Sequence, residues 1–236
     1  MKRNAEKPSE VEVQIGPLGL AGDLLLPAGE TREFILFAHG SGSSRHSPRN
    51  RYAAERLRQA GFGTLLMDLL TPEEEEEKTL TRHLRFDIGL LAGRLIEATD
   101  WIQYYSNTTA NSNRDLRIGY FGSSTGAAAA LAAASKRFSL VQAVVSRGGR
   151  PDLAGRVLRE VKAPVLLIVG GEDKQVIALN RQAFEKLGTR QKELVIVPGA
   201  GHLFEESGTL EAVTDLACGW FEIYLGLENH KNIQAA

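Results

Sequence analysis

A serine enclosed by glycines, Ser124, is the residue in this sequence best suited to act as a nucleophile. It lies in the pentapeptide 122–126 (GSSTG), with an apolar run before it at 116–121 and an alanine-rich stretch after it. This pattern predicts a strand that turns sharply into a helix and lifts the serine hydroxyl above the edge of a sheet. A Cβ atom at either flank of so tight a turn would collide, which accounts for the glycines. Ser124 is preferred to Ser123 because only Ser124 has glycine both two residues before and two residues after it.

A histidine and an aspartate later in the chain supply the other groups that serine chemistry requires. A hydroxyl becomes a good nucleophile when an imidazole accepts its proton, and a carboxylate fixes the tautomer of that imidazole. Of the five histidines, only His202 follows a late predicted strand, and Asp173 follows the strand before that one. The chain order serine, aspartate, histidine is the order expected when the serine lies on such a turn.

Each of these residues also has a simpler interpretation. The pentapeptide could be a Gly/Ser-rich turn without chemistry, His202 a solvated loop histidine, and Asp173 an N-cap of the next helix. Glu172, beside Asp173, is the second choice for the acid. Asp68 is a weaker choice, because it precedes Ser124 and so breaks the chain order.

The negative charge that develops on an attacked carbonyl oxygen needs fixed N–H donors. One should be the backbone N–H of Thr125, at the start of the helix that follows Ser124. The other should come from the Gly/Ser-rich loop that begins at His39, and the N–H of Ser41 is the first candidate. His39 is a candidate for substrate contact, although we expect its ring chiefly to order this loop.

Eight segments of high apolar content are expected to form the strands that position these residues. They are 11–15, 20–26, 34–38, 63–70, 116–121, 140–145, 165–169 and 194–197. Helices are expected between them and at the end, at 48–60, 82–105, after Ser124, at 152–161, 176–187 and 207–227. The pattern predicts a single α/β domain with a mostly parallel sheet of seven or eight strands, an antiparallel start and helices on both faces. The candidate residues would then meet at the carboxyl ends of the strands.

Composition and motifs exclude several other classes of function. The 28 basic and 29 acidic residues give a formal charge of −1, so nothing indicates a nucleic-acid partner. The sequence lacks the H-E-x-x-H and paired Cys/His spacings of metal sites, and its glycine-rich loops lack the phosphate-loop and dinucleotide patterns. We therefore expect a small-molecule substrate, with no metal and no cofactor.

The chain ends are expected to differ from the domain between them. Residues 1–10 and 228–236 are expected to be flexible, with the domain over 11–227. The beginning of the sequence has no apolar leader, and no apolar run approaches the ~18 residues that a membrane helix needs. These features predict a cytoplasmic protein without a membrane partner. The run of glutamates at 73–77 is interpreted as a solvated loop or helix start.

The chain resembles the α/β-hydrolase superfamily and, within it, the small dienelactone-hydrolase-like branch. The resemblance is carried by residues 39–42 (HGSG), 122–126 (GSSTG), 171–173 (GED) and 201–202 (GH), and covers about 11–227. It implies esterase-type hydrolysis through an acyl-enzyme, with Ser124, Asp173 and His202 as the triad. Dienelactone hydrolases have cysteine where this chain has Ser124, so their lactone specificity does not carry over.

The lengths of the connections indicate what kind of substrate would fit. Residues 146–164 leave room for only one short helix where many relatives insert a lid domain, which predicts an open site for small or accessible acyl groups. Arg147 leaves its strand at the active edge and is a candidate to bind a substrate carboxylate. The competing interpretation pairs Arg147 with Asp152.

Three functional hypotheses remain at this point. The first is a serine hydrolase of small carboxylic esters, thioesters or lactones. The second is a non-catalytic member of the fold that binds a small molecule or a protein and keeps the turn for structural reasons. The third is acyl transfer or perhydrolysis, which uses the same acyl-enzyme with a different second nucleophile.

Overall fold

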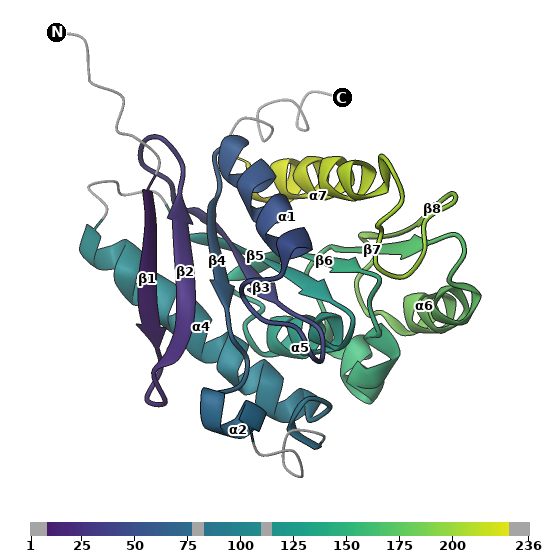
Figure 1. Cartoon of the computed structure of the whole chain (residues 1–236), viewed down its shortest axis with the longest axis horizontal. Helices are drawn as coiled ribbons and strands as arrows, with labels where there is room; N and C mark the ends of the chain where they lie inside the picture. Colours follow the sequence, from purple (N-terminus) through teal and green to yellow (C-terminus); the bar gives the residue numbers. More distant parts are fainter. Residues whose placement is uncertain (1–8, 77–82, 110–114, 227–236) are drawn as a thin grey trace, which may run out of the picture.

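A computed structural model describes residues 9–76, 83–109 and 115–226, and within them eight strands form one sheet in the order β1-β2-β4-β3-β5-β6-β7-β8 (Figure 1). The strands are β1 (Ser9–Ile15), β2 (Leu20–Leu26), β3 (Glu33–Ala38), β4 (Gly63–Met67), β5 (Arg117–Ser123), β6 (Val141–Arg147), β7 (Val165–Gly170) and β8 (Lys192–Val197). The pairs β1–β2 and β2–β4 are antiparallel, and all others are parallel. The predicted fold class is therefore confirmed.

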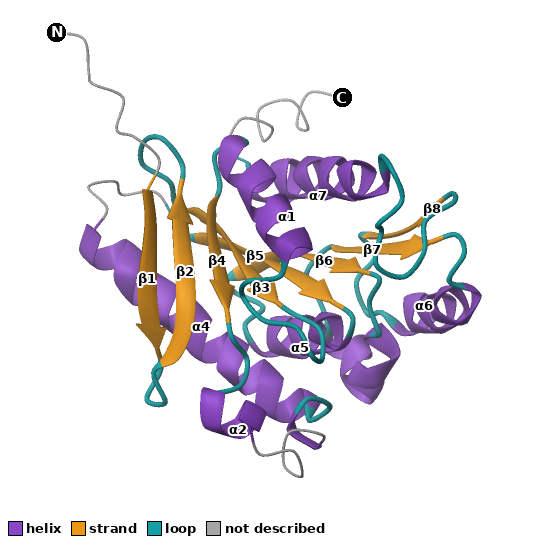
Figure 2. Cartoon of the chain, in the orientation of Figure 1, coloured by secondary structure: helices purple, strands orange, loops and turns teal. Residues whose placement is uncertain are grey.

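Helices cover both faces of the sheet, which is why the central strands are apolar throughout (Figure 2). Helices α1 (Pro48–Gln59) and α7 (Thr209–Leu225) share one apolar cluster with one face. Helices α4 (Ile88–Thr109), α5 (Thr125–Lys136) and α6 (Lys174–Lys186) cover the other face, together with a 3₁₀ segment at Pro151–Glu160. That 3₁₀ segment packs against α5 and α6 and leaves no lid domain between β6 and β7.

Two helices begin where local capping, rather than apolar spacing, allows. The helix predicted over 82–105 spans Ile88–Thr109 instead. It begins at Ile88 because the Asp87 carboxylate accepts a hydrogen bond from the N–H of Leu90 (2.9 Å) and caps its first turn. The acidic run is a helix start, α2 (Pro72–Glu76). Thr71 and Glu74 form its capping box, with N–H to side-chain distances of 2.9 and 3.3 Å.

The chain ends fall mainly outside the described residues. Most of the two segments predicted to be flexible, 1–10 and 228–236, lies outside the described residues, but Ser9 and Glu10 belong to β1. Arg82, the first residue of the predicted helix 82–105, and Glu77, the last residue of the acidic run, also lie outside the described residues. None of the helices in the described segments is both long enough and apolar enough to cross a bilayer.

Candidate active site

The turn between β5 and α5 holds Ser124 in a strained conformation. Its φ of 51° and ψ of −123° lie in a region that L-residues rarely adopt, and such strain is typical of functional turns. The neighbouring glycines make the turn possible: a Cβ on Gly126 would collide with the carbonyl oxygens of Ala38 and His39. The Ser124 carbonyl accepts hydrogen bonds from the N–H groups of Ala127 (3.1 Å) and Arg150 (2.9 Å), which hold the turn from both sides.

An imidazole and a carboxylate lie together on the loops that follow β7 and β8. His202 Nδ1 and Asp173 Oδ2 are 2.7 Å apart. Because a carboxylate can only accept, Nδ1 of the neutral ring carries the proton and Nε2 keeps a free lone pair. The other Asp173 oxygen accepts from the N–H of Val176 (3.3 Å), so Asp173 is both the imidazole's partner and the N-cap of α6.

Neither alternative acid contacts His202. Glu172 is exposed, and its N–H donates to the carbonyl of Ala200 (3.0 Å). Asp68 accepts from the backbone N–H of Arg45 (2.8 Å) and forms an ion pair with its guanidinium. Of the three carboxylates considered from the sequence, only Asp173 contacts His202.

Gly148 lies between the turn and the imidazole. The N–H of Ser124 donates to the carbonyl of Arg147 (3.4 Å), the residue before Gly148. A Cβ on Gly148 would lie 3.0 Å from the His202 carbonyl oxygen and 3.8 Å from His202 Cε1. His202 therefore lies beside the turn. No hydrogen bond joins its ring to Ser124 Oγ in the described residues, a looseness common at sites without substrate.

The loop after β3 lies directly over Ser124. A Cβ on Gly40 would lie 2.9 Å from Ser124 Cβ, so glycine is required for this approach. The N–H of Thr125, in the first turn of α5, has no acceptor within its own helix. The N–H of Ser41 instead donates to the hydroxyl of Thr125 (N···Oγ1 2.8 Å). This contact brings both predicted oxyanion donors together and places a side-chain hydroxyl between them, which sequence reasoning missed.

His39 orders this loop through both of its ring nitrogens. Its Nδ1 is 2.9 Å from the carbonyl oxygen of Gly40, and its Nε2 accepts from the N–H of Leu69 (3.0 Å). Burial of the ring lowers the pKa of His39, and the hydrogen bond to Gly40 offsets this only in part. Since both nitrogens contact backbone, neither is left to contact a substrate.

Arg147 is buried at the end of β6, where it contacts Ser123 and not Asp152. Its side chain is 8% exposed, and Nη2 donates to the Ser123 hydroxyl (3.0 Å), which in turn donates to Asn50 Oδ1 (3.1 Å). Burial, with a smaller contribution from Arg49, lowers the pKa of Arg147 to about 10. The proposed pairing with Asp152 is wrong, because Arg150 forms that ion pair (2.8 Å).

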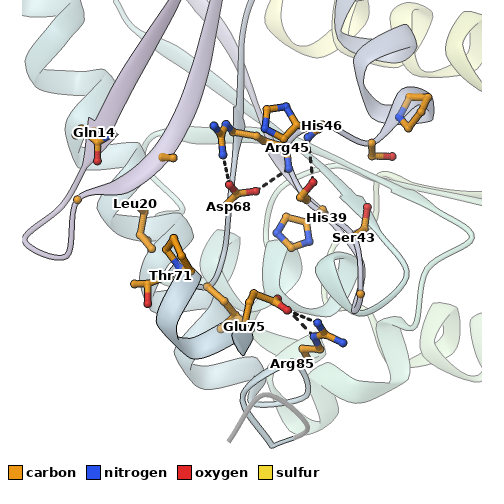
Figure 3. A pocket seen from close by; sticks show the side chains of 18 residues that line it. Gln14, Leu20, His39, Ser43, Arg45, His46, Asp68, Thr71, Glu75 and Arg85 are labelled. Atoms are coloured by element: carbon orange, nitrogen blue, oxygen red, sulfur yellow. Dashed lines mark hydrogen bonds and ion pairs between the residues drawn. The ribbon is translucent and has the colours of Figure 1, made fainter. Parts of the chain in front are cut away.

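A cavity of about 590 Å³ opens beside the loop over Ser124 (Figure 3). Its walls come from the β1–β2 turn, the loop 42–48, the end of β4 and the start of α2. Two ion pairs, Arg45 with Asp68 and Arg85 with Glu75, line it together with the edge of His39. A smaller pocket shares His39, Gly42, Glu75 and Arg85 with it and reaches Ser41 and Thr125. The smaller pocket thus lies between the cavity and the loop over the turn, while Ser124, Asp173 and His202 line neither of the two.

Metal ligation finds no support in this geometry. In the described ranges, no three histidine, cysteine or acidic side chains are arranged to hold a metal ion. The chemistry that the site offers is that of a serine hydroxyl, an imidazole–carboxylate pair and backbone N–H donors.

Comparison with known proteins places these features in context. The sequence profile of the Dienelactone hydrolase family matches residues 38–218. A crystal structure of a dienelactone hydrolase from Anabaena variabilis is 59% identical, with a TM-score of 0.83 over 93% of this chain and 99% of that one. A Xanthomonas campestris α/β serine hydrolase without a lid is 20% identical, with a TM-score of 0.68 over 92% of this chain and 94% of that one, which supports the fold alone.

Two curated relatives, from two strains of Mycobacterium tuberculosis, are 54% identical over 215 residues. Their name assigns them provisionally to the phosphoribosyl transferases. The match covers 91% of this chain but 46% of each relative, so the chain spans about half the length of these proteins.

Proposed function

The chain belongs to the dienelactone hydrolase family, and from that premise we propose that it is a serine hydrolase that cleaves small carboxylic esters, thioesters or lactones through an acyl-enzyme on Ser124. The observation that carries this proposal is the 2.7 Å contact between His202 Nδ1 and Asp173 beside the strained turn at Ser124. A protein that only binds a ligand has no need of an oriented base beside a serine held on a strained turn.

Each group has a role in the first half of the reaction. Ser124 Oγ attacks the carbonyl carbon while its proton passes to His202 Nε2, and Asp173 stabilises the imidazolium that forms. The N–H of Thr125, with Ser41 and the Thr125 hydroxyl beside it, stabilises the oxyanion. The tetrahedral intermediate then expels the alcohol or thiol, which takes the proton from His202.

The second half repeats these roles with water. Water loses a proton to His202 and attacks the acyl carbon, and Ser124 recovers its proton when the acid is released. An alcohol or peroxide in place of water would give acyl transfer or perhydrolysis with the same residues. Hydrolysis is the proposed reaction, in keeping with the family to which the chain belongs.

Covalent labelling with a fluorophosphonate tests the proposal directly. We expect the parent protein to be labelled at one site and Ser124→Ala to remain unlabelled. His202→Gln and Asp173→Asn should lower the labelling rate by roughly 10³-fold or more, since they remove the base or its orientation. Ser123→Ala is the matched control, because it changes the adjacent hydroxyl and should still be labelled.

Failure to label the folded parent, or equal labelling of Ser124→Ala, would contradict the proposal and favour the binding-module alternative. Circular dichroism should show that each variant is folded. Hydrolysis of p-nitrophenyl acetate and of simple lactones then measures kcat and KM.

The transferase activity in the name of the mycobacterial relatives is not part of this proposal. Those proteins are about twice as long, and more than half of each lies outside the match. A phosphoribosyl transferase activity can reside in the part that this chain does not span. Incubating the chain with phosphoribosyl diphosphate and a base acceptor should give no transfer product.

A further inference from the structure

The loop that carries His202, residues 198–208 between β8 and α7, contains a strained backbone position of its own (Figure 1). Phe204 has a φ of 56°, and in the part of the chain that the structure describes Ser124 is the only other non-glycine residue with a positive φ. A bulky residue rarely adopts this left-handed conformation, because its Cβ atom crowds the backbone. Such strain persists only where the surrounding structure enforces it, and it is typical of functional segments.

The ring of Phe204 holds this conformation in place. It is 2% exposed and belongs to the apolar cluster under α1 and α7. All the other residues from 201 to 208, His202 among them, are partly or fully exposed. Burial of the ring is therefore the apolar contact that attaches this loop to the core of the protein.

The same ring lies where the histidine loop meets the nucleophile turn. A Cβ on Gly148 would lie 3.3 Å from Phe204 Cε2 and 3.0 Å from the carbonyl oxygen of His202, so both residues lie against one glycine. Gly148 directly follows Arg147, whose carbonyl accepts from the N–H of Ser124 (3.4 Å). Phe204 thus links the position of His202 to that of the turn.

The polar contacts of the loop are weaker anchors than this ring. The N–H of Gly201 donates to the carboxylate of Glu206 (3.0 Å), but Glu206 is exposed, so this contact closes the loop on itself without attaching it to the core. Glu205 pairs with Arg49 of α1 (2.9 Å), and its side chain is 65% exposed. An ion pair so open to solvent contributes little.

We propose that Phe204 is the positioning residue for the imidazole of His202. Its left-handed backbone turns the chain back after His202, and its buried ring fixes that turn against Gly148, so that the imidazole stays beside Ser124. Phe204 touches no reacting group and acts only through the histidine. The part of this inference that concerns catalysis rests on the proposed hydrolase function.

Replacing Phe204 by alanine and by glycine separates the ring from the backbone. Phe204→Ala removes the ring and keeps the strain, whereas Phe204→Gly removes both, because glycine adopts a positive φ readily. We expect kcat for p-nitrophenyl acetate to fall roughly 10- to 100-fold in Phe204→Ala with KM little changed, since the base is misplaced. Phe204→Gly should keep a kcat several-fold higher than that of Phe204→Ala. A residue that merely fills the core predicts the opposite order, because glycine loosens the chain more than alanine does.

Phe221 provides the matched control. It is fully buried in the same apolar cluster but belongs to α7, where the backbone is helical. Phe221→Ala and Phe221→Gly should lower the melting temperature, glycine more than alanine, and leave kcat of the folded protein within about twofold of the parent. An unchanged kcat in Phe204→Ala would overturn the proposal, and so would an equal loss in Phe221→Ala or a lower kcat in Phe204→Gly than in Phe204→Ala.

Leucine variants keep the test decisive if Phe204→Ala does not fold. Phe204→Leu retains an apolar side chain at the strained position, so we expect it to fold and to lose only several-fold in kcat. Phe221→Leu should lose nothing. Equal kcat values in these two variants would overturn the proposal.

Nuclear magnetic resonance of the histidine rings tests the positioning without any substrate. The ¹⁵N shifts of His202, assigned with His202→Gln and recorded at about pH 8, above the usual range of histidine titration, report which ring nitrogen carries the proton. The contact with Asp173 predicts a proton on Nδ1 in the parent and in Phe221→Ala, and a shift toward the tautomer mixture of a free imidazole in Phe204→Ala.

The two kinds of measurement separate the two proposals. If fluorophosphonate does not label the parent but the His202 shifts change in Phe204→Ala alone, the hydrolase function fails while the positioning role stands. If the parent is labelled and the His202 tautomer is the same in Phe204→Ala as in the parent, the positioning role fails while the hydrolase function stands.

Discussion

The hydroxyl of Thr125 is the residue-scale feature that most changes the expected chemistry. It accepts a hydrogen bond from the Ser41 N–H (N···Oγ1 2.8 Å), so this N–H points at the Thr125 hydroxyl. A threonine hydroxyl has one proton to donate as well as lone pairs to accept with. The Thr125 hydroxyl can therefore donate its proton in a hydrogen bond to an oxyanion, while the Ser41 N–H polarises this hydroxyl. The Thr125 hydroxyl would then take the place of the Ser41 N–H as the second donor, beside the backbone N–H of Thr125.

Replacing this hydroxyl tests its contribution. Thr125→Val keeps the shape and removes both the acceptor and the donor, so kcat for p-nitrophenyl acetate should fall roughly tenfold or more with KM little changed. Thr125→Ser keeps the hydroxyl and should stay within a few-fold of the parent. An equal or higher kcat in Thr125→Val would mean that the hydroxyl merely occupies the Ser41 donor.

His39 makes stability depend on pH in a defined direction. Burial lowers its pKa, so the unfolded chain takes up a proton near pH 6.5 that the folded chain still refuses. The unfolded state then binds more protons, and the free energy of unfolding falls as the pH drops below about 6.5. His39→Gln should show a flatter dependence in urea unfolding between pH 5 and 7.5. A slope equal to that of the parent would contradict this.

At the scale of elements, the end of β4 fixes the loop that lies over Ser124. Leu69 N–H holds His39 at one end of that loop, and Asp68 holds Arg45 toward the other end. The Arg45 side chain also reaches Asp23 of β2 (3.3 Å), so one arginine joins the loop to two strands. The antiparallel hairpin thus helps to position the active edge of the parallel sheet.

Asp68→Asn tests this anchoring. The amide oxygen can still accept from the backbone N–H of Arg45, but the charge opposite the guanidinium is lost. We expect a loss of roughly 1–2 kcal/mol in the free energy of unfolding and a lower kcat, because the oxyanion loop is held less firmly. Arg56→Gln is the control: its pair with Asp215 is exposed, and its loss should change neither quantity measurably. Unchanged kcat in a destabilised Asp68→Asn would show that the anchoring serves stability alone.

Some of these arrangements follow from sequence patterns and others do not. Strand ends place Ser124, Asp173 and His202 on one edge, because carboxyl ends of parallel strands converge whatever the side chains do. The Thr125–Ser41 contact depends on a side-chain rotamer, on which strand and helix patterns have no bearing. The start of α4 at Ile88 depends on Asp87, whose capping chemistry was readable but lay within an otherwise helical spacing.

The direction of the Arg147 side chain is a further feature that the local sequence pattern does not predict. Its position at the end of an apolar strand indicated the active edge, but not which face of the sheet its side chain takes. Strand parity settles this: Ala143 and Val145 lie in the cluster under α1 and α7, and Arg147 continues that row. The pairing of Ser123 with Arg147 follows from the register of β5 on β6, which no local pattern specifies.

At the scale of the whole molecule, the order of the strands sets the order in which the site can be completed. From β6 onward each strand joins its immediate predecessor, so a chain leaving the ribosome can add the last strands one at a time (Figure 1). The turn at Ser124 can form early, but His202 follows the last strand, and α7 completes the face under α1 later still. A nascent chain is itself an ester, joined to transfer RNA. Under the proposed mechanism, its serine stays inert until His202 has been synthesised and has folded against Asp173.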